Sequence, residues 1–112
     1  MVESSDSKSS VTTRSQPVQQ LPKLVDLGAD KCIPCKMMKP ILDELDKTYQ
    51  DRFDVVFIDV WKNRDAGRQY GIRVIPTQIF FDAGGKERFR HEGFYSREEI
   101  MNKWRELGFT FE

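Results

Sequence analysis

The sequence predicts an α/β fold, a three-layer α/β/α sandwich around a small mixed sheet. From Leu21 onward, short apolar runs alternate with longer amphipathic stretches, which indicates the order strand, helix, strand, helix. Two later strand-like runs are separated by Gly84-Gly85, which predicts a hairpin. A last amphipathic stretch follows them. Helices that join parallel strands cover the faces of a sheet and a hairpin adds antiparallel pairing, so we expect a mixed sheet between helical layers.

The chain is long enough for one domain core. Its 112 residues are 38% hydrophobic, and we expect the domain to occupy residues 21–112. Residues 1–20 contain six Ser, two Thr and three Gln and almost no large apolar side chains, so they are predicted to be a disordered tail. A short edge strand at Val11–Thr13 is the alternative, because β-branched residues cluster there.

The first strand and the first helix flank the two cysteines. Leu24–Leu27 is an apolar run with a single acid, which is typical of a strand buried on both faces. Pro34–Tyr49 is predicted to be a helix because apolar residues recur at helical spacing, namely Met38, Ile41, Leu42, Leu45 and Tyr49. Pro34 suits the first turn, whereas Pro40 lies inside the helix and is expected to kink it.

The remaining elements complete the sandwich. Phe53–Val60 is predicted to be the second strand and Trp61–Tyr70 a short polar helix. Thr77–Phe81 and Glu87–His91 are predicted to pair as the hairpin. A capping-box pattern, Ser-x-x-Glu, begins an amphipathic helix within Ser96–Gly108.

Charge and hydropathy exclude several classes of function. Eighteen Lys and Arg balance eighteen Asp and Glu, so no basic excess favours nucleic acid as a partner. The longest apolar runs are far shorter than the ~20 residues that span a bilayer. Met1–Ser10 has no apolar core that would direct export, so we expect a cytoplasmic location, or an extracytoplasmic one if a leader has been removed.

Cys32 and Cys35 are the chain's two cysteines and form a C-x-x-C motif where a strand gives way to a helix. The partial positive charge of the helix N-terminus stabilises a thiolate at the first position, and Lys31 adds a positive charge beside it. The three-residue offset lets the second thiol reach back to the first. The motif therefore predicts redox chemistry and leaves no cysteine for a structural disulfide.

Half of a zinc site is the alternative interpretation of the motif. A tetrahedral site needs about four ligands, and this chain offers two thiols and one distant imidazole, His91. Only a dimer would complete the set, so we expect no metal. His91 follows residues of alternating charge and is predicted to be a solvated surface residue.

Asp26 is an acid inside an otherwise apolar strand, six residues before the first cysteine. Burial raises the pKa of a carboxyl group, and an acid poised near neutrality can take the proton of Cys35 and return it. Alternatively, Asp26 is hydrogen-bonded to backbone or faces solvent. Its position alone leaves both interpretations open.

Several stretches together resemble thioredoxins in order and spacing. They are Leu24–Leu27, the C-x-P-C-K motif within Ala29–Lys36, Pro40–Leu42, Tyr70–Thr77 and Gly84–Lys86. The resemblance covers roughly Leu21 to Leu107. The combination of these stretches is far more specific than C-x-x-C alone.

The resemblance implies roles for individual residues. Cys32 is expected to be the nucleophile, Cys35 the resolving thiol and Asp26 the buried acid-base residue. Pro76 is expected to be a cis-proline beside the dithiol. The residues expected to contact an extended substrate are Ile33, Pro34, Ile75, Pro76 and Gly93.

The sequence departs from the family's usual pattern near the motif. Lys31 and Gly28 stand where thioredoxins usually carry aromatic residues, and Ile33-Pro34 replaces Gly-Pro. The usual lysine close to the buried acid is expected to be replaced by Val55, and the family's leading strand and helix have no clear counterpart. Trp61 and Trp104 are predicted to be packing residues, because aromatics at such spacing usually fill cores.

We therefore expect a protein-disulfide reductase that acts as a monomer without a bound cofactor. It would take electrons from an upstream thiol reductase and pass them to protein disulfide substrates. A disulfide oxidase or isomerase is the alternative within the same chemistry, because thiolate stability sets the redox direction. A non-catalytic binding module with an apolar surface around Ile33 and Ile75, and a metal-bridged dimer, are the alternatives from other classes.

Overall fold

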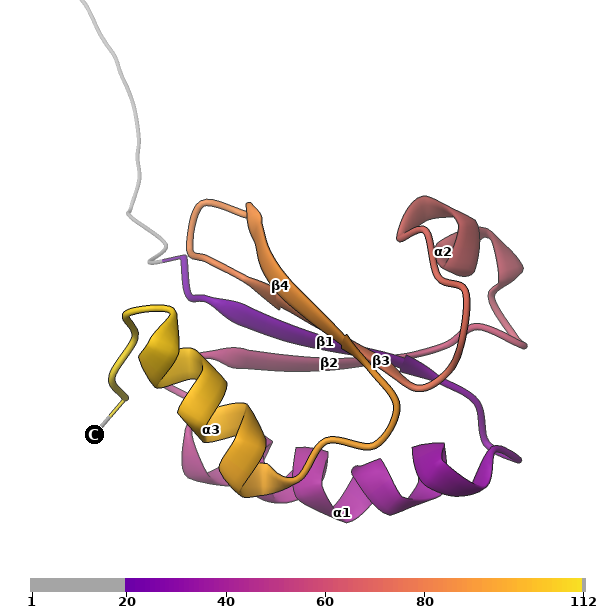
Figure 1. Ribbon diagram of the computed structural model, residues 1–112, viewed down its shortest axis with the longest axis horizontal. Helices are drawn as coiled ribbons and strands as arrows, with labels where there is room; N and C mark the ends of the chain where they lie inside the picture. The colour runs from indigo at the N-terminus through magenta and orange to yellow at the C-terminus, as the bar shows by residue number, and fades with distance from the viewer. Residues whose placement is uncertain (1–19, 112) are drawn as a thin grey trace, which may run out of the picture.

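The computed structural model describes residues 20–111, and Figure 1 traces its seven helices and strands. The predicted tail therefore lies almost wholly outside the described residues. In chain order the elements are β1 (Lys23–Gly28), α1 (Ile33–Thr48), β2 (Asp54–Asp59), α2 (Arg64–Gln69), β3 (Thr77–Phe81), β4 (Glu87–Glu92) and α3 (Arg97–Glu106).

The four strands form one mixed sheet in the order β2-β1-β3-β4. β1 pairs in parallel with β2 and antiparallel with β3, and β3 and β4 form the predicted antiparallel hairpin. The central position of β1 explains its apolar composition, because both of its faces are covered and five of its six residues are buried.

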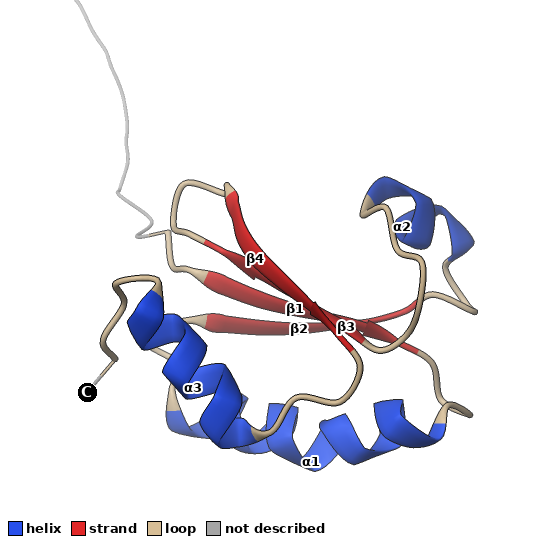
Figure 2. Ribbon diagram, viewed as in Figure 1, coloured by secondary structure: helices blue, strands red, loops and turns tan. Residues whose placement is uncertain are grey.

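Helices α1 and α3 lie against one face of the sheet and α2 lies on the other, as Figure 2 shows. This arrangement confirms the predicted three-layer α/β/α sandwich with a mixed sheet. The larger core lies under α1 and α3, where the Trp104 ring packs 4.9 Å from that of Phe80 and 5.2 Å from that of Phe53. Trp104 is therefore a packing residue, as predicted.

Alternation along β1 decides which side chains face which layer. Leu24 belongs to the core under α1 and α3, whereas Val25 and Leu27 belong to the smaller cluster on the opposite face. Side chains two residues apart in a strand share a face, so Asp26 points to the same side as Leu24, toward α1. An acid is thus placed on the apolar face that α1 covers.

The starts of helices α3 and α1 agree closely with the sequence patterns that predicted them. The predicted capping box is present in α3: the Ser96 hydroxyl accepts from the N–H of Glu99, whose carboxylate accepts from the N–H of Ser96. Helix α1 begins after Cys32 and continues through Pro40 to Thr48.

Helix α2 is shorter than the predicted Trp61–Tyr70. The Asp59 carboxylate accepts hydrogen bonds from the N–H groups of Trp61 and Lys62, which holds these residues in a turn. The helix begins only after Asn63, whose side chain accepts from the N–H of Ala66. Within residues 20–111, no helix combines the length and apolar character needed to cross a bilayer.

Candidate active site

Cys32 and Cys35 form a disulfide at the N-terminus of α1, with their Cα atoms 5.1 Å apart. Cys32 is the N-cap residue and is half-buried, whereas Cys35 lies in the first turn and is only 3% exposed. An attacking thiol must be accessible and a resolving thiol need not be. The difference in exposure matches the roles that the resemblance implies for the two cysteines.

The first turn of α1 is suited to a thiolate at Cys32. An N-cap side chain faces the N–H groups that open a helix, and no acidic residue occupies this turn. Pro34 supplies no N–H group, so the donors at the start of this turn are the N–H groups of Ile33 and Cys35. The positive end of the helix dipole favours a negative charge at the same place.

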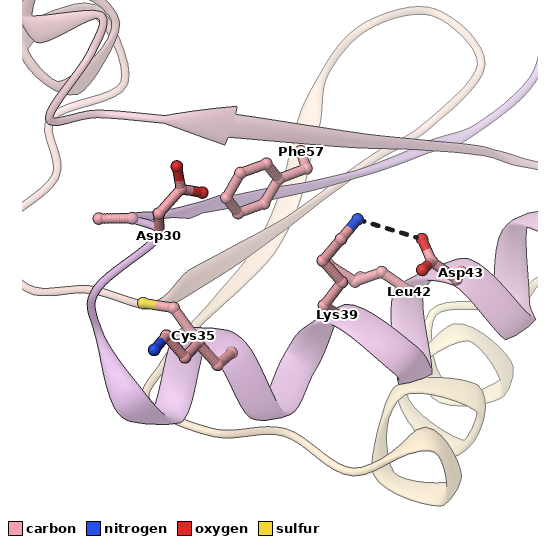
Figure 3. Close-up of a pocket in the computed structure, with 8 residues that line it drawn as sticks. Asp30, Cys35, Lys39, Leu42, Asp43 and Phe57 are labelled. Atoms are coloured by element: carbon pink, nitrogen blue, oxygen red, sulfur yellow. Dashed lines mark ion pairs between the residues drawn. The ribbon is translucent and has the colours of Figure 1, made fainter.

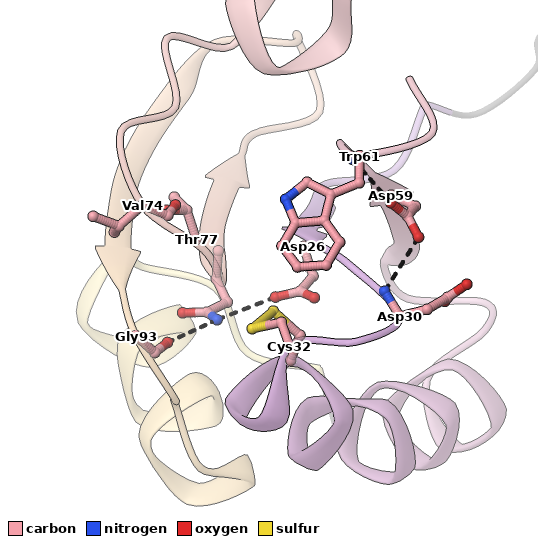
Figure 4. The surroundings of a disulfide bond; sticks show 10 residues. Asp26, Asp30, Cys32, Asp59, Trp61, Val74, Thr77 and Gly93 are labelled. Carbon is pink, nitrogen blue, oxygen red and sulfur yellow. Dashed lines mark hydrogen bonds between the residues drawn. A yellow bond between two sulfur atoms is a disulfide. The ribbon is translucent and has the colours of Figure 1, made fainter. Parts of the chain in front are cut away.

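Asp26 is fully buried on β1, and Figure 4 includes it among the side chains around the disulfide. Burial raises the pKa of Asp26 from 3.8 to about 6, and a hydrogen bond from Gln78 opposes this rise. Its Oδ2 atom has no hydrogen-bond partner among the described residues. The structure excludes the interpretation that Asp26 faces solvent. The hydrogen-bond partner of the Asp26 carboxyl is the side chain of Gln78 and not a backbone group.

Gly28 follows Asp26 on the same face of β1 and lies against Cys35. A Cβ atom added at Gly28 would come 3.0 Å from Sγ and 3.1 Å from Cβ of Cys35. The glycine therefore permits the close approach of α1 to the strand. This contact gives a physical reason for a small residue at the position where thioredoxins usually carry an aromatic one.

The strand register corrects the prediction that Val55 replaces the family's lysine beside Asp26. Val55 pairs with Leu24, and the residue paired with Asp26 is Phe57. Phe53 belongs to the core before the strand begins, and pairing starts at Asp54 with Lys23, so the neighbour of Asp26 lies further along β2. The position is apolar, as predicted, but a different residue fills it.

Phe57 also lines a pocket of about 300 Å³ between β2 and α1. Figure 3 shows its ring above the N-terminal half of α1, where Cys35 and the Lys39–Asp43 ion pair, 3.7 Å long, form the opposite wall. The buried Cys35 is therefore one of the residues that line this pocket.

The loop before β3 supplies the other predicted site residues. The Ile75–Pro76 peptide bond is cis, as predicted, and Val74 and Thr77 on either side of this pair are among the side chains around the disulfide in Figure 4. The N–H of Gly93 donates to the carbonyl oxygen of Pro76 at 2.7 Å, which ties Gly93 to this loop. The structure thus brings Pro76 and Gly93 together, and Gly93 belongs to the surroundings of the disulfide in Figure 4.

Trp61 is not the packing residue that its sequence position suggested. Its side chain is 55% exposed and belongs to the surroundings of the disulfide in Figure 4. Other exposed apolar side chains near the active-site helix and loops are Ile33, Val74 and Phe94. The polar residues that follow Trp61 were the available signal, because they leave it without apolar neighbours at helical spacing.

His91 is not the solvated surface residue that was predicted. It is half-buried, its ring stacks on Tyr95 with centroids 3.8 Å apart, and its Nδ1 lies 3.0 Å from Oε1 of Gln78. Gln78 is itself fully buried and was not recognised as a candidate residue. Among the residues described, no cluster of three or more His, Cys, Asp or Glu is placed to hold a metal ion.

Comparison with known proteins places the chain in a family. A thioredoxin family model matches residues 7–106. The chain belongs to the thioredoxin family. Thioredoxin of Pseudomonas aeruginosa is 42% identical over 66 residues, which make up 59% of this chain and 61% of that protein. Thioredoxin of Rickettsia prowazekii is 44% identical over 82 residues, which cover 73% of this chain and 77% of that protein.

The thioredoxin fold is also found by comparison with solved structures. A malarial protein superposes with a TM-score of 0.73 at 21% sequence identity, and the match covers 80% of this chain and 99% of that one. The chain aligns with about three fifths of the length of the Pseudomonas aeruginosa protein and 61% of thioredoxin of a Synechocystis strain. The family and the fold of this chain are therefore established.

Proposed function

We propose that this thioredoxin-family protein is a protein-disulfide reductase that cycles Cys32 and Cys35 between dithiol and disulfide. The proposal depends mainly on the Cys32–Cys35 pair, in which a half-buried N-cap cysteine is joined to a buried one. The buried Asp26, whose pKa is raised, lies near this pair. The relatives named thioredoxin support the same chemistry.

The first step is attack by the Cys32 thiolate on one sulfur of a substrate disulfide. A new bond forms between Cys32 Sγ and that sulfur, the substrate S–S bond breaks, and the departing substrate thiolate takes a proton from solvent. The N–H groups and dipole at the start of α1 stabilise the attacking thiolate. The product is a mixed disulfide between enzyme and substrate.

The second step is resolution by Cys35. Asp26 takes the proton of the Cys35 thiol, and the resulting thiolate attacks Sγ of Cys32. The mixed disulfide breaks, the second substrate thiolate leaves and is protonated, and the enzyme disulfide forms. The substrate has then gained two electrons and two protons, and an upstream thiol reductase must restore the dithiol.

An extended segment of the substrate would lie on the apolar surface beside Cys32. We expect that surface to comprise the apolar residues Ile33, Trp61, Val74, Ile75 and Phe94, together with Pro34, Pro76 and Gly93. The backbone of Ile75 at the cis-proline loop would pair with the substrate backbone, which suits an unfolded or flexible protein segment better than a compact one. Trp61 supplies an aromatic surface in a region where Gly28 and Lys31 supply none.

The experiment is disulfide reduction of a model protein by dithiothreitol in the presence of wild-type protein, Cys32→Ser and Cys35→Ser. We expect turnover by the wild type, loss of turnover in both variants, and a trapped enzyme–substrate adduct in Cys35→Ser alone, read by mass spectrometry. Full turnover by Cys35→Ser, or adducts on Cys32→Ser, would contradict the proposed roles. Absence of wild-type turnover would contradict the reductase assignment itself.

A further inference from the structure

One residue from each strand forms a row across the sheet face that α1 covers. The register pairs Asp26 with Phe57 on one side and with Gln78 on the other, and pairs Gln78 with His91. Three members of the row are connected: Nε2 of Gln78 lies 3.1 Å from Oδ1 of Asp26, and Oε1 of Gln78 lies 3.0 Å from Nδ1 of His91. The connection runs from the buried acid to a half-buried imidazole at the sheet edge.

We propose that Gln78, held by His91, is a positioning residue for the resolving step: it occupies Oδ1 of Asp26 and leaves Oδ2 as the oxygen that takes the Cys35 proton. This inference rests on the proposed function, in which Asp26 is the base for Cys35. The inference adds that Oδ2 is the oxygen of Asp26 that takes the proton, and that Gln78 and His91 determine this choice.

The hydrogen-bonding groups of Gln78 fix the direction of its amide. Nε2 donates both of its hydrogens, one to Oδ1 of Asp26 and one to the carbonyl oxygen of Gly93 at 3.0 Å. A flipped amide would place Oε1 against these two acceptors. Since Oε1 can only accept, Nδ1 of His91 must carry the proton in their contact, in the neutral as well as the charged imidazole.

The His91 ring is itself held in place. It stacks on Tyr95 at an interplanar angle of 11°, so rotation of the ring away from Gln78 would break both contacts. The pKa of Glu92 on the same strand is lowered mainly by its hydrogen bond with Arg73 and that of Glu99 on α3 mainly by hydrogen bonds with Ser96, and His91 makes a small contribution to each. The imidazole therefore lies between an aromatic ring and acidic groups, and holds Gln78 from outside the core.

Among residues 20–111, no charged group balances Asp26 from the elements packed around it. β2 presents Phe57, α1 presents Cys35, and β3 presents the neutral Gln78, while His91 on β4 acts only through Gln78. Oδ2 is buried with no partner among the described residues. In the described part of the chain, both lone pairs of Oδ2 are free, whereas one lone pair of Oδ1 already accepts the hydrogen bond from Gln78, so Oδ2 is the oxygen that can take a proton with the least disturbance of existing contacts.

The test uses Gln78→Met, which keeps the length of the side chain but removes its donors. Carbon NMR of the Asp26 carboxyl in the reduced protein gives its titration, and stopped-flow decay of the mixed disulfide gives the resolving rate against pH. We expect the Asp26 midpoint and the pH profile of resolution to move upward together by about one unit or more, because the ionised carboxyl loses the hydrogen bond from Gln78. Gln50→Met is the matched control, since Gln50 is exposed at the end of α1, and it should leave both unchanged.

His91→Phe keeps a ring on Tyr95 but leaves Oε1 of Gln78 unbonded, and it alters no fully buried position, so it serves if Gln78→Met does not fold. We expect a smaller shift in the same direction. An Asp26 midpoint and a pH profile equal to wild type in the folded variants would overturn the role of Gln78 and His91. Asp26→Asn separates this failure from failure of the proposed function: a wild-type pH profile in Asp26→Asn would remove Asp26 from the resolving step altogether.

Discussion

The amide nitrogen of Gln78 donates a hydrogen bond of 3.1 Å to Oδ1 of Asp26, and both side chains are fully buried. A neutral amide stabilises a carboxylate less than a cation would, so it only partly offsets the cost of burying the charge. The result is a carboxyl whose pKa is raised from 3.8 to about 6 because burial outweighs the hydrogen bond. An acid in this range can both accept and release a proton near neutral pH.

The raised pKa of Asp26 predicts how stability depends on pH. Below about pH 4 the carboxyl is protonated in the folded and unfolded states alike, and between about pH 4 and 6 the unfolded chain ionises first, so stability falls as pH rises. Above the folded pKa the loss is complete and amounts to about 3 kcal/mol. Asp26→Asn should therefore stabilise the oxidised protein by up to that amount at about pH 8 and have little effect at about pH 4. Urea unfolding of both proteins at the two pH values measures this, and a less stable Asn variant at the higher pH would contradict it.

Gly28 offers a test of the packing between β1 and Cys35. Gly28→Ala would place a Cβ atom 3.0 Å from Cys35 Sγ and 3.3 Å from the Phe57 ring, where neither strand nor helix can easily give way. We expect destabilisation of about 1–3 kcal/mol. Gly67→Ala on α2 is the matched control, because the nearest atom to its added Cβ is 3.7 Å away. That control should be neutral or stabilising by up to about 1 kcal/mol, and equal effects of the two substitutions on thermal unfolding would contradict the account.

Trp61 offers a test of the proposed substrate surface. The side chain is 55% exposed, so Trp61→Ala should change the free energy of unfolding by no more than about 0.5 kcal/mol. The KM for a protein disulfide should rise several-fold, because the substrate segment loses an aromatic contact. Reduction of a small disulfide that cannot reach Trp61 serves as the control and should keep its rate. An unchanged KM for the protein substrate would remove Trp61 from the surface.

The predicted tail can be tested independently of the active site. Residues 1–20 contain almost no large apolar side chains, so they can bury little surface. We therefore expect deletion of residues 1–17 to leave the unfolding midpoint and disulfide reduction nearly unchanged. A shorter protein that fails to fold would mean that this segment contributes an element of structure, such as a strand at Val11–Thr13.

Most helices and strands of this fold can be predicted from the sequence because the patterns that indicate them are local. The spacing of Met38, Leu42 and Leu45 predicts α1, and Ser96 with Glu99 predicts the start of α3, since each pattern lies within a few turns of chain. The surroundings of Asp26 depend instead on strand register. Gln78 is 52 residues away from Asp26, and a two-residue difference in register separates Phe57 from Val55. Neither the contact between Gln78 and Asp26 nor the register between β1 and β2 produces a periodic pattern in the sequence.

The predictions for Trp61 and His91 were wrong for a related reason. Trp61 follows a strand, where an apolar residue is usually buried, but the Asp59 carboxylate holds the chain in a turn that exposes it. His91 lies in a strand of charged residues, but its pairing with Gln78 directs it inward to a polar partner within the core. In both cases a few local contacts of one side chain outweigh the average behaviour of the surrounding residues.

The equilibrium reduction potential of the Cys32–Cys35 pair tests the central claim most directly. The measurement equilibrates the protein with glutathione or dithiothreitol buffers and counts free thiols by mass spectrometry after alkylation. A protein-disulfide reductase must hold a reducing couple, so we expect a potential of about −270 mV, as in other thioredoxins. A potential of about −180 mV or higher is typical of disulfide isomerases and oxidases, and it would contradict the assignment of this protein as a reductase.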